Sequence, residues 1–170
     1  MAFTVEDGTR VARANAYVTV AWADAYHLER GNQAWTGIDT VREHAIVRAT
    51  DYVEMRYARR FRGNMADGSD QPLSWPRENT EYDTDEIPEP LKRAVAEYAM
   101  RALASALAPD PAYDEQGFIR AKTRQQVGPI MTEYSVHSLD GAAVPALTRD
   151  YPLADGLIRP LLFNTRGVYR

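Results

Sequence analysis

The spacing of apolar residues predicts helices in the first part of the chain. After Thr19, whose hydroxyl suits a helix N-cap, the stretch VAWADAYHLERG carries apolar residues on roughly one face and stops at Gly31. From Val41 to Arg60, small and apolar residues recur at helical intervals. Thr40 and Glu43 have the spacing of a capping box at the start of this second segment. We therefore expect two helices before residue 61.

A third helix is predicted over EPLKRAVAEYAMRALASALAPD, which carries the widest apolar face of the chain. Pro90 is tolerated in a first helical turn, and Pro109 is expected to end the helix. Further on, two alternating stretches around a Gly-Pro turn predict a β-hairpin over residues 118–136. A lone hairpin is marginally stable unless it packs on something else. Residues 151–162 predict a short helix broken near Pro160.

Periodicity disappears over residues 61–87, a loop of a length that is usually functional or ordered by a partner. Within it, the motif QPLSWPR places Leu73 and Trp75 on the same side of an extended segment. Trp75 can be interpreted as a stacking platform for a base, or as an apolar anchor that holds the loop against the helices. We favour the anchor, with Arg77 binding a carboxylate of the same chain or of a neighbouring copy.

The predicted architecture is mainly α: a small helical bundle with a protruding β-hairpin and extended N- and C-terminal arms. It forms a single domain in this interpretation. Residues 1–18 are the N-terminal arm, residues 19–108 are the helical core with its long loop, and residues 163–170 are the C-terminal tail.

Composition narrows the function classes. A chain of 170 residues can bury a core as one domain, and 45% hydrophobic with 26% charged residues is typical of a soluble protein. The absence of cysteine excludes disulfides, a thiolate nucleophile and a cysteine zinc site. No stretch reaches the roughly 18–20 apolar residues that span a bilayer, and we expect no membrane contact and no signal peptide. The net charge of −4 argues against coating nucleic acid by bulk electrostatics.

Motifs that carry chemistry are scarce. His27, His44 and His137 lie on separate predicted elements without metal-ligand spacing, and no phosphate-binding loop or nucleophile elbow occurs. The acidic run from Glu78 to Glu89 lacks the residue order of a calcium loop and is interpreted as solvated or facing a partner. We therefore expect no enzyme activity, no cofactor and no metal.

The charged residues offer two candidate surfaces. Four arginines gather at the end of the second predicted helix, namely Arg56, Arg59, Arg60 and Arg62. They suit the negative end of a helix, or they contact phosphate or acidic groups of the following loop or of a neighbouring copy. These acids are Glu81, Asp83, Asp85 and Glu86. A second basic stripe alternates along the first hairpin strand and faces either phosphate or solvent: Arg120, Lys122 and Arg124.

Four stretches in this order, AYVTVAWADAYHLERG, ATDYVEMRYARRFRG, QPLSWPR and LKRAVAEYAMRALA, resemble a family of small phage and prophage proteins. Its members are often labelled DnaT-like single-stranded-DNA-binding proteins, and they are similar in outline to the head–tail connector (adaptor) proteins of long-tailed phages. The resemblance covers about residues 15–165. It implies a helical bundle with a hairpin, assembled as a ring of about twelve copies below the portal.

The connector resemblance also implies partners and a place. The C-terminal tail would bind the portal protein, through Phe163, Asn164, Thr165, Arg166, Gly167, Val168, Tyr169 and Arg170. The next neck or tail component, a stopper or tail terminator, would bind the opposite face. Double-stranded DNA would pass through the channel without sequence specificity. The protein would assemble in the bacterial cytoplasm and end in the neck of the virion.

The alternative is the activity that the label states, binding of single-stranded DNA. That activity needs aromatic platforms beside a positive groove. Trp75 with Arg77 is one candidate, and Trp22, Trp35 and the ten tyrosines offer others. Because acids follow Trp75 within a few residues and repel phosphate, the connector is the favoured interpretation.

Overall fold

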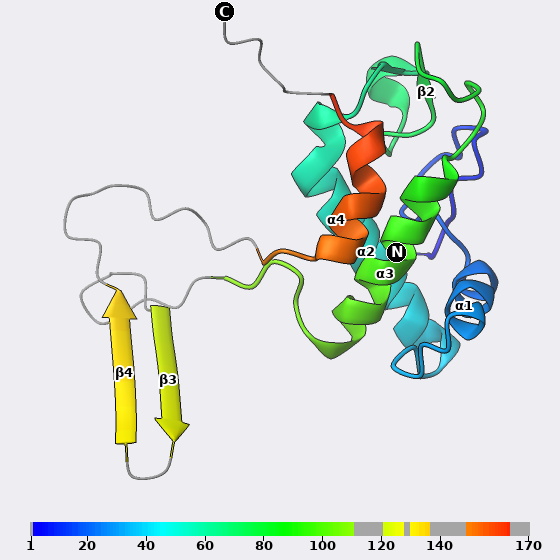
Figure 1. Ribbon diagram of the computed structural model, residues 1–170. Coiled ribbons are helices and arrows are strands. Elements are labelled where there is room, and N and C mark those ends of the chain that lie inside the picture. Colours follow the sequence, from blue (N-terminus) through cyan, green and yellow to red (C-terminus); the bar gives the residue numbers. More distant parts are fainter. Residues whose placement is uncertain (1, 111–120, 128–129, 137–148, 164–170) are drawn as a thin grey trace, which may run out of the picture. The chain divides into compact units, whose positions relative to one another are not determined.

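The computed structural model describes residues 2–110, 121–127, 130–136 and 149–163. It divides into two compact units, which we describe separately (Figure 1). The first unit contains the chain up to Leu107 and again from Asp150 onward, and the second contains Ala108–Arg149. The described part of the chain is mainly helical and includes the two-stranded hairpin that the sequence predicted. No helix within the described ranges is long and apolar enough to cross a bilayer.

The first helix, α1, spans Val20–Glu29, as the apolar spacing predicted. The Thr19 hydroxyl accepts a hydrogen bond from the Trp22 N–H at 3.1 Å, which satisfies one of the free donors of the first turn. The helix stops at Arg30, and Gly31 follows with a φ of +63°, a conformation that glycine adopts without strain. Both ends of this helix are therefore determined by residues next to them in the sequence.

The second helix, α2, spans Asp39–Tyr57 and is extended by a 3-10 turn, η1, over Ala58–Arg60. The predicted capping box is wrong, because the helix begins before Thr40 and its N-cap, Ile38, makes no side-chain cap bond. Asp39 instead places a negative charge in the first turn, where it interacts favourably with the positive end of the helix dipole.

The third helix, α3, spans Glu89–Ala104 with Pro90 in its first turn. It ends at Ser105, well before Pro109, so the predicted end is wrong. The physical reason is tertiary: Leu107 turns back into the core, and its carbonyl accepts a hydrogen bond from the Tyr151 hydroxyl at 3.0 Å. The predicted last helix is confirmed as α4, Pro152–Ile158, followed by a 3-10 turn, η3, over Arg159–Leu161.

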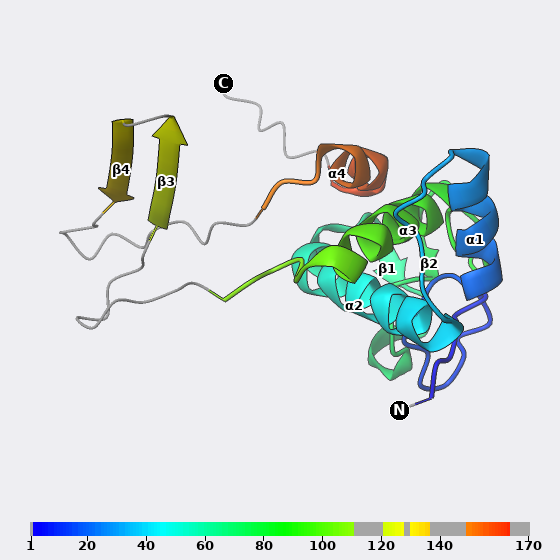
Figure 2. The same ribbon diagram turned by 90° about the horizontal axis from the view of Figure 1, so that it is seen from below.

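The core of the first unit lies between α2, α3 and α4, with α1 against α2 and α3 (Figures 1 and 2). Small residues on the facing sides of α2 and α3, such as Ala49 and Ala94, are fully buried and let the two helices approach closely. Larger side chains, such as Ile46, Leu91 and Ile158, fill the remaining space, each contributing about 1.5–3 kcal/mol by burial.

The N-terminal segment is extended, as predicted, but it is packed on the helices and is not a free arm. Tyr17 and Val18 are buried in the core, and the Glu6 N–H donates to the carbonyl of Ala16 at 2.8 Å. Gly8 has a φ of +108° and lies so close to the Asp85 carbonyl that an added Cβ would stand 1.8 Å from its oxygen. The segment therefore depends on glycine at this contact.

The long loop is ordered by two short antiparallel strands, β1 (Asn64–Met65) and β2 (Arg77–Glu78), with a 3-10 turn, η2, over Gly68–Asp70 between them. Gly63, at a φ of +72°, passes within reach of the Glu78 carbonyl, and a Cβ there would lie 2.1 Å from the oxygen. Contacts between its own residues therefore hold the two ends of this part of the loop together.

The described part of the second unit is the hairpin of β3 (Ala121–Val127) and β4 (Ile130–Val136). The strands pair antiparallel from Ala121 opposite Val136 to Val127 opposite Ile130. The predicted hairpin is confirmed, although its predicted first residues, 118–120, lie outside the described residues. The predicted tail also lies outside them beyond Phe163.

Candidate interaction surfaces

The motif QPLSWPR lies inside the structure and offers no open aromatic face. The Trp75 side chain is 1% exposed, and its ring packs edge-on against Phe61 and Tyr82 at centroid distances of 5.9 and 5.8 Å. Leu73 is buried beside it in the same core cluster. In this position Trp75 holds the long loop to the helices, and a base cannot stack on it.

A carboxylate on α2 organises the same motif. One Glu54 oxygen accepts hydrogen bonds from the Ser74 N–H and hydroxyl at 3.1 and 2.5 Å, and the other accepts from the Tyr17 hydroxyl at 2.5 Å. The Trp75 N–H in turn donates to the Tyr17 oxygen at 3.2 Å. Burial raises the pKa of Glu54, and burial together with the Glu54 charge raises the pKa of Tyr17. Glu54 therefore joins α2, the N-terminal segment and the loop.

We expected Arg77 to bind a carboxylate, but in the described part of the chain it binds backbone carbonyls instead. Its guanidinium is buried and donates to three backbone carbonyls, those of Arg62, Gly63 and Ser74, at 2.7, 2.7 and 3.1 Å. Burial lowers its pKa, although the nearby charge of Glu54 opposes this shift. A loop with few regular backbone bonds has free carbonyls, and Arg77 satisfies several of them at once.

Two of the four clustered arginines bind groups of the same subunit through their side chains. Arg56 binds the Tyr52 hydroxyl and lies 3.7 Å from the carboxylate of Asp155, so it faces α4 and not the acidic loop. Arg62 donates from Nε to the Leu162 carbonyl at 2.9 Å. Arg56 thus pairs with Asp150 and Asp155, and Arg62 makes no ion pair with the acids of residues 81–86 in the described part of the chain, although Arg62 and Glu81 line the same pocket.

A tyrosine network around Asp155, which sequence reasoning missed, holds α4 in place. The Asp155 carboxylate accepts hydrogen bonds from the hydroxyls of Tyr57 and Tyr98 and from the Tyr151 N–H. Burial alone would raise the pKa of Asp155, but these hydrogen bonds outweigh it and the pKa lies below its usual value. Burial likewise raises the pKa of Tyr57 to about 12. Because the partners are far apart in the chain, no local pattern points to the network.

The remaining arginines form an exposed surface at one end of the first unit. Backbone hydrogen bonds place η1 and η3 side by side, since Arg62 N–H donates to the Leu161 carbonyl at 3.0 Å and Phe163 N–H to the Arg60 carbonyl at 2.9 Å. The members of this arginine patch are exposed: Arg59, Arg60, Arg159 and Phe163. The sequence pointed to two of these arginines, but Arg159 joins them only through the fold.

The acids of the long loop line a cleft of about 410 Å³ on the same unit. This acidic cleft presents Asp7, Asp85 and Glu86 as exposed carboxylates and Trp22 as a partly exposed ring. Glu6 also lines it but is buried, and its carboxylate already accepts bonds from the backbone N–H groups of residues 8, 10 and 11. Glu81 and Asp83 are exposed nearby in sequence.

A second cleft, of about 480 Å³, is lined by His27, Trp35 and Arg42 but carries no free reactive group. Trp35 and Arg42 both donate to Asp24, at 2.6 and 2.7 Å. The His27 Nε2 lies 3.2 Å from the Ala96 carbonyl, its Nδ1 is hydrogen-bonded to an asparagine amide, and burial lowers its pKa. His27 is therefore a neutral, fully bonded ring, and no group of three or more metal-binding side chains occurs in the part of the chain that is described.

The other predicted basic stripe, along the first hairpin strand, belongs to the second unit. Lys122 and Arg124 occupy alternate positions of β3, and Arg124 stands opposite Glu133 in the strand register. Arg120 and His137 lie outside the described residues.

Comparison with known protein families identifies a match over the full chain. The model of a family described as "Putative DnaT-like ssDNA binding protein" matches residues 1–170, which is the whole chain. No curated protein and no solved structure matches it.

Proposed function

We propose that this chain, which belongs to the DnaT-like single-stranded-DNA-binding family, acts as a structural subunit that assembles with copies of itself. In particular, we propose that it is a head–tail connector (adaptor) of a long-tailed phage. It would form a ring of about twelve copies beneath the portal, in the neck of the virion.

The observation that carries this proposal is the hairpin. The described part of the second unit is a single two-stranded sheet, inserted in the sequence between α3 and α4. An isolated hairpin is at best marginally stable in water. In the proposed ring, a neighbouring subunit or the next neck component would supply a surface for such an element.

The burial and ring contacts of the aromatic side chains support a structural role over stacking on bases. Trp75 and Trp35 are buried, and Trp22 stacks on Tyr26 at a centroid distance of 5.5 Å. Among the large apolar side chains that the described ranges leave exposed, Phe163 is the one aromatic ring. A net charge of −4 also suits a channel through which DNA slides, because strong phosphate binding would hold the DNA in place.

The test is removal of residues 164–170 from the gene carried by an infecting phage. We expect the subunit to fold, because these residues follow the last described contact of the core, and we expect filled heads and tails to accumulate unjoined. Wild-type protein supplied from a plasmid should restore joining. Normal infectious particles from the deletion, or absence of the protein from purified virions, would contradict the proposal.

Single-stranded DNA binding is the second candidate, and the description of the family favours it. A mobility-shift titration with labelled single-stranded DNA at physiological salt distinguishes the two. A connector should bind weakly, with a steep loss of binding as salt increases. Tight binding that is lost when Lys122 and Arg124 are replaced by alanine would favour the second candidate.

A further inference from the structure

We propose that the arginine patch of one copy binds in the acidic cleft of the next copy, which makes a head-to-tail interface between subunits. This inference rests on the proposed function and names the surfaces through which the copies meet. Both surfaces belong to the first unit and are built from described residues.

The arginine patch is open on the subunit itself. The side chains of Arg59 and Arg159 make no ion pair or hydrogen bond among the described residues, and the Arg60 side chain makes a ring contact there, 5.6 Å from the centre of Tyr57. Phe163, 57% exposed, adds an apolar surface beside the cations, and Met55, 65% exposed, lies one helical turn before Arg59. Arginines around an apolar centre are a composition typical of protein interfaces.

The acidic cleft has the complementary chemistry. Asp7, Asp85 and Glu86 are exposed and make no ion pair in the described part of the chain, whereas the cation in the cleft, Lys92, is held by Glu89 at 3.5 Å. Carboxylates bind a guanidinium through paired hydrogen bonds, and the face of a ring such as Trp22 attracts it as well. The cleft is therefore suited to a long basic side chain.

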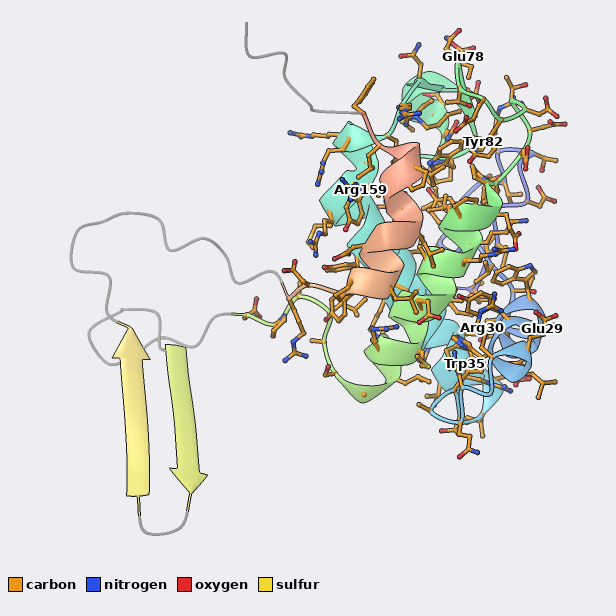
Figure 3. All side chains as sticks on the ribbon, viewed as in Figure 1. Glu29, Arg30, Trp35, Glu78, Tyr82 and Arg159 are labelled. Atoms are coloured by element: carbon orange, nitrogen blue, oxygen red, sulfur yellow. The ribbon has the colours of Figure 1, made fainter. Side chains whose placement is uncertain are left out.

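The two surfaces are built from different parts of the subunit. The arginine patch belongs to η1, η3 and the residue after η3, and Figure 3 labels its Arg159 beside α4. The acidic cleft is lined by the N-terminal segment, the start of α1 and the end of the long loop, so the two surfaces share no residue. The patch and the cleft of one chain are consequently placed to serve different neighbours. Complementary surfaces on two sides of a subunit produce a heterologous contact, which closes into a ring or continues as a filament.

A second copy fits the observations better than nucleic acid does. Phosphate would use the arginine patch and would be repelled by the carboxylates of the cleft, so the cleft would have no role. In a contact between copies, both surfaces are used and their opposite charges also guide the approach of the subunits. The two possibilities therefore predict opposite effects of adding positive charge to the cleft.

Charge reversal tests the interface directly. Self-association of the full chain is measured by sedimentation velocity at low ionic strength for R59E/R60E, for D85K/E86K and for the variant that carries all four changes. We expect each pair alone to weaken association about tenfold or more and the four changes together to restore it to within about threefold of wild type. The matched control, D67K/D70K, changes two exposed acids of the same loop outside the cleft and should leave association unchanged.

Cross-linking gives an independent readout, because the chain has no cysteine. R60C and E86C chains are prepared separately and treated with a short bis-maleimide, alone and mixed. A head-to-tail contact predicts a cross-linked product only in the mixture. Products from R60C alone, or none in the mixture, would overturn the inference.

The outcomes separate this inference from the proposed function. If the wild type assembles but reversal of the patch or the cleft changes nothing, the interface is wrong and the connector proposal stands. If D85K/E86K strengthens binding of single-stranded DNA and R59E/R60E abolishes it, without rescue by the combination, the patch binds nucleic acid and the inference fails. Absence of the protein from virions overturns the proposed function itself.

Discussion

At the scale of single residues, Trp75 shows how a loop without periodicity can be stable. Its ring fills the space between Phe61 and Tyr82, while its indole nitrogen makes no hydrogen bond. The stabilisation therefore comes from buried apolar area and close packing, and not from the polar end of the side chain.

We expect Trp75→Ala to lower the free energy of unfolding by roughly 3–5 kcal/mol, because it removes a large buried ring and leaves a cavity. Trp75→Phe should cost clearly less, since it keeps an aromatic ring and loses a nitrogen that has no partner. Urea denaturation followed by circular dichroism measures both. Equal stability of the alanine variant and the wild type would show that the ring does not hold the loop.

Glu54 is the polar counterpart of Trp75. Glu54→Gln places an amide NH₂ where the carboxylate accepts bonds from Ser74 and Tyr17. The unpaired donors should cost about 1–3 kcal/mol at neutral pH. The neighbouring change Met55→Gln, at a side chain that is 65% exposed, is the control and should be nearly neutral. Equal unfolding midpoints for the two variants would contradict the role of Glu54.

The sequence indicated Trp75 but not Glu54, and the difference has a physical cause. Leu73 and Trp75 are apolar residues spaced for one side of an extended segment, which is a local pattern. A glutamate on a helix is ordinarily a surface residue. Its partners lie 20 and 37 positions away, so its role depends on tertiary contacts that no spacing rule contains.

At the scale of elements, periodicity predicted those segments that bury one face against the rest of the chain. α1, α2, α3 and α4 are of this kind, and the alternation of residues along the chain predicted the hairpin. The boundaries were less predictable. α3 ends at Ser105 because Leu107 turns back into the core and accepts a hydrogen bond from Tyr151, a contact that the local sequence does not indicate. The packing of the N-terminal segment, described from residue 2 to residue 18, was not predicted. This segment packs through backbone bonds and a close glycine contact, which leave no periodic pattern.

The docking of α4 depends on the ionised form of Asp155. Because the folded-state pKa lies below the unfolded value, its contribution to stability is present above the unfolded pKa and is lost as pH falls through the folded one. We expect Asp155→Asn to cost roughly 1–3 kcal/mol at neutral pH and to lose less stability than the wild type does on acidification below about pH 4.

The control for this prediction is Asp150→Asn. Asp150 lies 3.6 Å from the same arginine, Arg56, but its side chain is 82% exposed. An exposed pair of this kind contributes little, so the change should be much milder than Asp155→Asn. Thermal unfolding across a pH series measures both variants, and a wild-type-like acid response in Asp155→Asn would contradict the role of its charge.

At the scale of the whole molecule, the sequence revealed the candidate charges but not how they are grouped. Arg59, Arg60, Asp85 and Glu86 stood out because like charges are clustered along the chain. Arg159 was missed, because it joins the arginine patch through the pairing of η1 with η3. Asp7 was missed for the same reason, since the folded N-terminal segment brings it to the loop.

The two units should be separable, because the chain divides into two compact units and the described core cluster lies within the first. The points where the chain leaves and re-enters this unit are close together, since the Tyr151 hydroxyl donates to the Leu107 carbonyl at 3.0 Å. A short flexible linker can therefore replace residues 110–148 at a small cost in loop-closure entropy. We expect such a variant to keep the helical content and nearly the thermal stability of the full chain.

The same variant should nevertheless fail to join heads to tails, because in our proposal the hairpin binds a neighbouring subunit or the next neck component. Circular dichroism measures folding, and an in vivo complementation assay measures joining. Variants with linkers of two different lengths serve as the control, since loss of stability with one length alone would indicate a strained connection. Loss of folding with both would mean that the first unit needs the second, and normal joining with both would mean that the hairpin has no part in assembly.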